Sequence, residues 1–140
     1  LEIWELSWQE INKRPLLGYG FATFWRNGGP AEAVWRQTDF HAPNAHNGWI
    51  DLALDLGIPA VIILAAWMLW LALRLLRWAW AAANKSYGFE AIVLLGLFSF
   101  VNMNNMAETV VFRHNELAWS LLVAIAVLTS FAANGSKVRH

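Results

Sequence analysis

The sequence predicts an all-α, polytopic transmembrane protein fragment, with about three membrane spans and an external segment that carries short amphipathic helices. Apolar residue types make up 58% of the 140 residues and charged residues only 14%, whereas about 25% charged residues is typical of soluble domains. Three stretches contain no charged residue: 56–73, 91–107 and 117–133. Each would form a helix roughly 26 Å long, close to the hydrocarbon thickness of a bilayer.

Composition also excludes several other classes of protein. Ten basic residues balance ten acidic residues, so no net field attracts nucleic acid. The chain has no cysteine, which excludes a disulfide scaffold, and its hydrophobicity excludes intrinsic disorder. The remaining alternative, buried helices of a large soluble protein, is disfavoured because the three runs leave almost no polar face.

The first predicted element is an amphipathic helix over residues 1–12. Trp4, Trp8 and Ile11 recur at helical spacing, with acidic residues and glutamine between them. Tryptophan is typical of the membrane interface. The sequence Arg14-Pro15 ends this helix, because a residue before proline avoids helical backbone angles.

Turns and a short helix are expected to follow. Gly18 and Gly20 flank Tyr19 and predict a tight turn. Residues 27–30 predict a second loop and residues 31–37 a short helix. A polar and aromatic stretch, residues 39–49, then leads through residues 50–55 into the first span.

The Lys and Arg residues predict the topology of the spans. The loop after the first span and the tail after the third are basic, so we assign both to the cytoplasm. Residues 1–50 then form an external, periplasmic loop, together with residues 108–116, and residues 51–140 form the C-terminal transmembrane part. The second span ends in three asparagines, which we expect to face protein or the interface.

Three kinds of chemistry are open to the external segment. His41 and His46 with Asp39 or Asp51 could bind a metal, but the histidine spacing of five differs from the helical ligand pair. Nucleophilic catalysis lacks a cysteine or a Gly-x-Ser-x-Gly turn. His46 could act as a general base beside anion-binding arginines, or could have only a structural, helix-capping role.

The order of these motifs resembles the O-antigen ligase and polymerase superfamily, in particular its exopolysaccharide-production polymerase branch. The similarity lies in Arg14-Pro15-Leu16-Leu17-Gly18-Tyr19-Gly20-Phe21, in His46-Asn47 with Gly57 eleven positions after His46, and in the long apolar span that follows. Asn105-Met106-Ala107-Glu108-Thr109, followed by Asn115 and Trp119, is similar to the C-terminal region of that branch. The resemblance extends over essentially all 140 residues.

The resemblance implies a multi-pass protein of the bacterial inner membrane. Members transfer a glycan from undecaprenyl diphosphate to an acceptor saccharide, with no cofactor and no metal. His46 takes the role of general base and Arg14 that of holding the diphosphate. We also expect five residues to bind substrate: Tyr19, Asn47, Asp51, Glu108 and Arg113. Asp51 or Asp55 could orient the His46 imidazole.

The sequence leaves two wider questions as expectations. We expect these 140 residues to be the C-terminal part of a longer protein. The 140 residues would then lack an arginine that members of this superfamily often have shortly before the position of Trp4. We expect this part to be inactive by itself. The rival to the enzyme hypothesis is a transporter or a non-catalytic membrane subunit of polysaccharide export, in contact with other export proteins. In that case His46 and the asparagine cluster would line a path or an interface.

Overall fold

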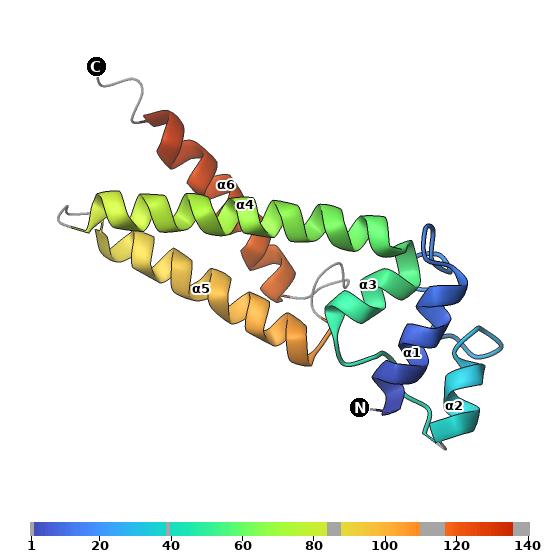
Figure 1. Ribbon diagram of the computed structural model, residues 1–140. Helices are drawn as coiled ribbons and strands as arrows, with labels where there is room; N and C mark the ends of the chain where they lie inside the picture. The colour runs from blue at the N-terminus through green and yellow to red at the C-terminus, as the bar shows by residue number, and fades with distance from the viewer. Residues whose placement is uncertain (1, 39, 84–87, 110–116, 136–140) are drawn as a thin grey trace. The chain divides into compact units, whose positions relative to one another are not determined.

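Over the residues that it describes, the computed structural model is all-α, with six helices, and confirms the predicted fold class (Figure 1). It describes residues 2–38, 40–83, 88–109 and 117–135, with side chains described up to residue 129. The chain divides into two compact units. The first unit is Leu1–Ala65 with Asn105–Thr109, and the second is Ala66–Asn104 with Val110–His140.

Helix α1, Glu2–Lys13, is the predicted amphipathic helix. Acidic residues lie in its first turn and Lys13 lies in its last, which suits the helix dipole. Its buried face includes Leu6 and Ile11, while Trp8 is exposed. Helix α2, Glu32–Thr38, agrees with the predicted short helix and buries Val34 and Trp35. The core of the first unit joins these faces to Phe24 and to Leu54 of α3.

Helix α3, Gly48–Leu56, is separate from the helix that follows it. Its N-cap is Asn47, whose side-chain oxygen accepts bonds from the N–H groups of Trp49 and Ile50 at 3.0 and 3.3 Å. It ends at Gly57, which has the left-handed φ of +83°. The sequence predicted that residues 50–55 lead directly into the first span, and the structure instead interrupts the helix at this glycine.

Helices α4, Ile58–Ala82, and α5, Gly88–Ala107, are long and apolar enough to cross a membrane. Pro59 lies in the first turn of α4, where a proline is tolerated because its missing N–H would have no helical partner. Helix α4 continues beyond the predicted span to Ala82, and includes Arg74 and Arg77.

Helix α6, Leu117–Gly135, coincides with the third predicted span. Its apolar stretch Leu117–Thr129 is shorter than the other two candidates, so its crossing of the membrane stays a prediction. Within the second unit, Leu71 and Leu75 of α4 are fully buried. The Arg74 guanidinium donates to the Thr129 carbonyl of α6 at 2.9 Å.

Candidate functional site

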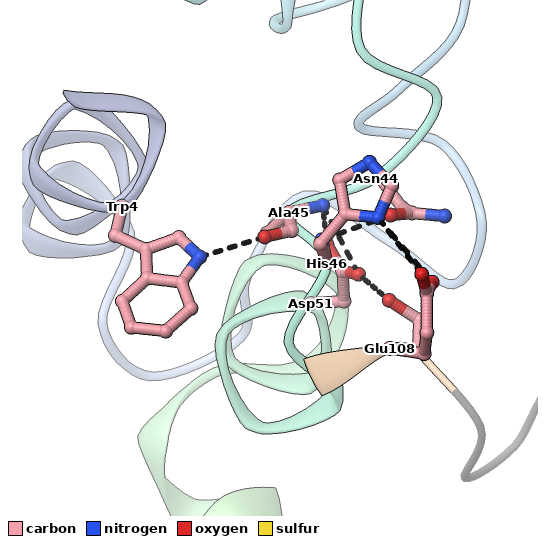
Figure 2. A network of polar contacts seen from close by, with 7 residues as sticks. Trp4, Asn44, Ala45, His46, Asp51 and Glu108 are labelled. Carbon is pink, nitrogen blue, oxygen red and sulfur yellow. Dashed lines mark hydrogen bonds and ion pairs between the residues drawn. The ribbon is translucent and has the colours of Figure 1, made fainter. Parts of the chain in front are cut away.

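His46 lies immediately before the N-cap of α3, in a strained backbone conformation. Its φ of +51° is left-handed, which a non-glycine residue adopts only when its surroundings impose it. The His46 N–H donates to the Asn44 side-chain oxygen at 2.8 Å. Ala45 is held from the other side, since the Trp4 indole N–H donates to its carbonyl at 2.8 Å (Figure 2). This pair of contacts fixes the direction in which the imidazole leaves the backbone.

The imidazole of His46 faces a carboxylate from a distant part of the chain. Its Nδ1 lies 3.3 Å from both carboxylate oxygens of Glu108, which follows the last residue of α5. Both side chains are about half exposed, at 46% and 56%. Figure 2 shows Nε2 on the side of the ring away from Glu108. The pair therefore presents an imidazole nitrogen to solvent while the carboxylate holds the other one.

Asp51 is a buried carboxylate behind the histidine. It accepts bonds from the Trp25 indole N–H at 2.7 Å, from the Ala45 N–H at 3.0 Å and from the Thr109 hydroxyl. Burial raises its pKa, and these three donors together with the His46 charge oppose the rise. Asp51 thus connects α3 to three other parts of the chain, through Ala45, Trp25 and Thr109.

A close backbone contact brings the end of α5 onto the start of α3. A Cβ at Gly48 would lie 1.9 Å from the side-chain oxygen of Asn105, which is fully buried. Only glycine allows this approach. The predicted inward position of the asparagine cluster is confirmed for Asn105, and the contact places Glu108 within reach of His46.

A second set of hydrogen bonds lies at the other end of α3, around the Pro15–Gly20 turn. The N–H groups of Tyr19 and Gly20 donate to the carbonyls of Leu54 and Asp55 at 2.7 and 2.9 Å. The Ile58 N–H donates to the Pro15 carbonyl at 2.7 Å. These bonds satisfy backbone groups that a helix end leaves without a helical partner, so the predicted tight turn closes the junction between α3 and α4.

The two glycines of the motifs make this junction possible. A Cβ at Gly18 would lie 2.6 Å from the Asp55 backbone, and a Cβ at Gly57 would lie 2.5 Å from that of Leu16. Both glycines also have left-handed φ angles, +62° and +83°. The glycine eleven positions after His46 therefore has a structural reason: it lets the turn pack against the first residue of α4.

Tyr19 and Arg14 contact each other beside this turn. The Tyr19 hydroxyl donates to the Glu10 carboxylate at 2.7 Å, and the Arg14 guanidinium carbon lies 5.0 Å from the Tyr19 ring centre. Burial, followed by the bond to Glu10, raises the pKa of Tyr19 to about 12, so its hydroxyl stays protonated at neutral pH. Arg14 is exposed, which leaves its guanidinium open to an anion.

Asp55 lies at the same junction and accepts the Ala22 N–H at 2.9 Å. Burial raises its pKa to about 6, and the nearby Asp51 charge adds to the rise, while the Ala22 bond opposes it. Either carboxylate was expected to orient His46. The structure gives Asp51 and Asp55 other hydrogen-bond donors, and it is Glu108 that faces the imidazole.

The structure therefore divides the predicted site residues into two groups. Four of them surround the N-terminal end of α3: His46, Asn47, Asp51 and Glu108. Arg14 and Tyr19 lie at its C-terminal end, roughly 12 Å away by the length of a nine-residue helix. Arg113 and Asp39 lie outside the described residues.

Sequence reasoning missed Trp25, Asn44 and Thr109 as parts of this network. Trp25 and Thr109 join the network through bonds to Asp51 across 26 and 58 residues, so their roles depend on tertiary contacts, although Thr109 ends the Asn105–Thr109 motif. Asn44 bonds to His46 only two residues away, but no motif marks it. Among the residues that the structure describes, no three His, Asp or Glu side chains gather in a way that could hold a metal ion.

One family model matches the N-terminal part of the chain. Residues 1–65 match the Wzy_C family model, described as O-antigen ligase. The matched region includes His46, Asp51, Gly57 and the Pro15–Gly20 turn, and the match supports a glycosyltransferase-like membrane enzyme. The resemblance expected over residues 66–140 stays a prediction. Neither a curated protein nor a solved structure matches the chain.

Proposed function

We propose that the chain forms part of a membrane enzyme that transfers a glycan from undecaprenyl diphosphate to an acceptor sugar. The observation that carries the proposal is the pairing of His46 Nδ1 with Glu108 at 3.3 Å. This pairing orients His46, which lies in the region that matches the O-antigen ligase family model, so that it could act as a base. An exposed imidazole held by a carboxylate is a common arrangement for removing a proton from a hydroxyl group.

The reaction needs a single proton acceptor at the His46 imidazole. Glu108 accepts the Nδ1 proton and so fixes the tautomer in which Nε2 has a free lone pair. Nε2 takes the proton of the acceptor hydroxyl while its oxygen bonds to the anomeric carbon of the donor glycan. The bond from that carbon to the phosphate oxygen breaks, and undecaprenyl diphosphate leaves with the electron pair.

Arg14 supplies positive charge for the departing diphosphate in this proposal. Its guanidinium is exposed and rests against the Tyr19 ring, which limits its motion. The next residue, Pro15, is bonded to Ile58 in the first turn of α4, and a lipid-linked phosphate would lie at this end of the apolar helix. A guanidinium can bind two phosphate oxygens at once, and its charge favours the transition state as negative charge develops.

Asn47 and Asp51 act through the backbone in this mechanism. Asn47 caps α3, and Asp51 binds the Ala45 N–H directly before His46. Both therefore stabilise the left-handed conformation from which the imidazole projects. Their role as substrate-binding residues is replaced in this proposal by one of positioning His46.

We place this site on the periplasmic face of the bacterial inner membrane. The contact between His46, which precedes α4, and Glu108, which follows α5, supports the predicted topology. It requires the start of α4 and the end of α5 to lie on one side, as two consecutive crossings would give. The distribution of Lys and Arg residues assigns the opposite side to the cytoplasm.

The first test compares His46→Gln with His41→Gln in the full-length protein. Each is expressed at matched membrane abundance in a bacterial host that lacks the corresponding glycan-transferring enzyme, and glycan length is read on a gel. His41 is a suitable control because it lies on the same segment and contacts only the Trp35 ring, at 4.9 Å, among its described interactions. We expect His46→Gln to lose at least about 100-fold in product, the usual contribution of a general base, and His41→Gln to retain it. Equal product from both variants would reject the proposal and favour the transporter alternative.

The second test addresses Glu108, with Glu90→Gln in the first turn of α5 as a control that removes a carboxylate elsewhere in the chain. We expect Glu108→Gln to lower kcat roughly tenfold to 100-fold with little change in KM, because it affects the orientation and basicity of His46. The pH profile of kcat should also shift in Glu108→Gln, because the variant changes the basicity of His46. An unchanged pH profile together with a raised KM would instead make Glu108 a substrate-binding residue.

A further inference from the structure

The Pro15–Gly20 turn presents two leucines whose exposure has no explanation within the first unit. Leu16 is 70% exposed and Leu17 is 83% exposed, while Ile11, a few residues earlier, is 1% exposed. Phe21, directly after the turn, is also exposed. The unit has a core that accepts Ile11 and Phe24, so these leucines are directed away from it by the turn.

The turn cannot move away from the start of α4. The Ile58 N–H donates to the Pro15 carbonyl, and the Gly57 backbone lies directly against that of Leu16, too close for any Cβ. Two further backbone bonds, from Tyr19 and Gly20, hold the other side of the turn to α3. The two leucines are therefore fixed beside the first residue of an apolar helix.

The depth of the membrane boundary follows from the residues of that helix. Asp55 is the last charged residue before the apolar run, and Ile62 and Ile63 in the second turn of α4 are 61% and 70% exposed. If α4 crosses a bilayer, these isoleucines face acyl chains and Ile58 lies near the interface. Because Pro15 is bonded to Ile58, Leu16 and Leu17 must lie at the same depth.

The charges beside the turn fit the same position. Lys13 and Arg14 precede the leucines and are exposed. Lysine and arginine next to an inserted apolar residue extend toward lipid phosphates. Trp8, one turn earlier on α1, is 55% exposed, and tryptophan favours the interface. Basic, aromatic and aliphatic residues together match the phosphate, interfacial and acyl levels of one membrane leaflet.

We propose that the Pro15–Gly20 turn inserts Leu16 and Leu17 into the membrane leaflet that α4 enters, with Arg14 at the level of the phosphates. Insertion of the two leucines would attach the first unit to the bilayer surface directly, in addition to the attachment that the membrane-spanning helices provide. This inference does not depend on the catalytic role of His46.

The test uses the natural absence of cysteine from the chain. A single cysteine is introduced as Leu17→Cys, labelled with an environment-sensitive fluorophore, and reconstituted in vesicles of phosphatidylcholine and phosphatidylglycerol. Quenching by nitroxide-labelled lipid is compared with quenching by aqueous iodide. Ile63→Cys serves as the lipid-exposed reference. Gln37→Cys, exposed on α2 of the same unit, serves as the water-exposed reference.

We expect the probe at residue 17 to be quenched by lipid nitroxide several-fold more than the probe at residue 37, and to approach the probe at residue 63. Iodide quenching should follow the opposite order. Strong iodide quenching at residue 17 would overturn the proposal. Protection from both quenchers would also overturn it, because a protein surface would then cover the leucines. Leu16→Cys repeats the measurement at the adjacent position in case labelling at residue 17 disturbs folding.

Discussion

The polar side chains around the candidate site bind groups far away in the sequence, whereas those of α5 in the second unit bond within their own helix. In the second unit, Ser99, Asn102 and Asn104 each donate to a carbonyl four residues earlier in their own helix. In the first unit, Trp4, Trp25, His46 and Thr109 bind groups that lie 41, 26, 62 and 58 residues away.

This difference explains why the candidate site lies in the first unit. A bond to the preceding turn satisfies a polar group inside an apolar helix but gives no information about neighbouring elements. A long-range bond fixes the geometry between two segments. A catalytic base needs that kind of fixation. The first unit supplies it to His46 in addition to local bonds such as those of Gln37 and Thr38 to carbonyls four residues earlier.

The largest effect on stability is expected at Asp51. Asp51→Ala removes the acceptor of Trp25, Ala45 and Thr109, and it should lower the free energy of unfolding by about 3 kcal/mol, because buried donors would lose their partner. Asp51→Asn keeps one acceptor oxygen and should cost about 1 kcal/mol. Unfolding of the full chain in detergent micelles, followed by tryptophan fluorescence, measures both. Similar losses for the two variants would show that the network depends on charge rather than on the acceptor atoms.

The next largest effect is expected at Gly57, and a comparison with Gly28 distinguishes the cost of backbone strain from the cost of a steric clash. Gly57→Ala should cost about 2 kcal/mol or more, because the left-handed φ and the Leu16 backbone both oppose a Cβ. Gly28→Ala is the matched control, since Gly28 has a φ of +75° and no atom within 4 Å of its virtual Cβ. The loss in unfolding free energy is measured in both variants, and the difference between the two losses gives the cost of the clash with Leu16. Equal losses would mean that the turn does not pack closely against Gly57.

In the second unit the comparison concerns packing alone. Leu71 and Leu69 lie on α4, and Leu71 is fully buried while Leu69 is 61% exposed. Leu71→Ala should cost about 1–2 kcal/mol through the cavity that it leaves, and Leu69→Ala less than about 0.5 kcal/mol. Thermal unfolding in micelles is a sufficient readout. A large loss at Leu69 would reveal a packing partner that the described residues do not include.

The smallest effect is a dependence of stability on pH at the α3–α4 junction. The pKa of Asp55 is about 6 in the folded protein against 3.8 in the unfolded chain, so the folded state binds the proton more tightly. Stability is therefore lost as pH rises from about 4 to about 6. Asp55→Asn keeps the acceptor for the Ala22 N–H and removes the charge.

This variant should be more stable than wild type by about 1 kcal/mol at pH 7, after allowance for solvent screening, and equal to it at pH 4. Unfolding midpoints of the two proteins at both pH values check the expectation. A difference that stays constant with pH would mean that Asp55 ionises as it does in the unfolded chain. Asp51, whose pKa is also raised, helps to raise the pKa of Asp55. Part of the stability gained by Asp55→Asn therefore comes from removing the repulsion between the two carboxylates.

The helices were largely predictable, because their determinants are local. The spacing of Trp4, Trp8 and Ile11, the proline at position 15 and the uncharged runs identified α1, α4, α5 and α6. The break between α3 and α4 was missed, because residues 50–55 and the uncharged run that follows them both suit a helix. The interruption at Gly57 depends on a left-handed φ that periodicity does not reveal.

The candidate site was predictable only as a set of residue types. His46, Asp51 and Glu108 were each identified from the sequence. Asp51 or Asp55 was the expected partner of His46, by analogy with the carboxylate that orients a catalytic imidazole. The pairing with Glu108 spans 62 residues. It results from the fit of Asn105 against Gly48, which no local pattern encodes.

The sequence by itself determined that this is an all-helical chain with membrane-crossing potential and a polar, histidine-bearing segment before the first long helix. Helical periodicity, charge-free length and turn-forming residues are properties of consecutive residues, and they act before any distant contact forms. Only the tertiary structure decided which carboxylate faces His46, why Gly57 follows it, and where Leu16 and Leu17 lie relative to α4. Those features are set by hydrogen bonds and close contacts between remote segments, and their energy exists only when the segments meet.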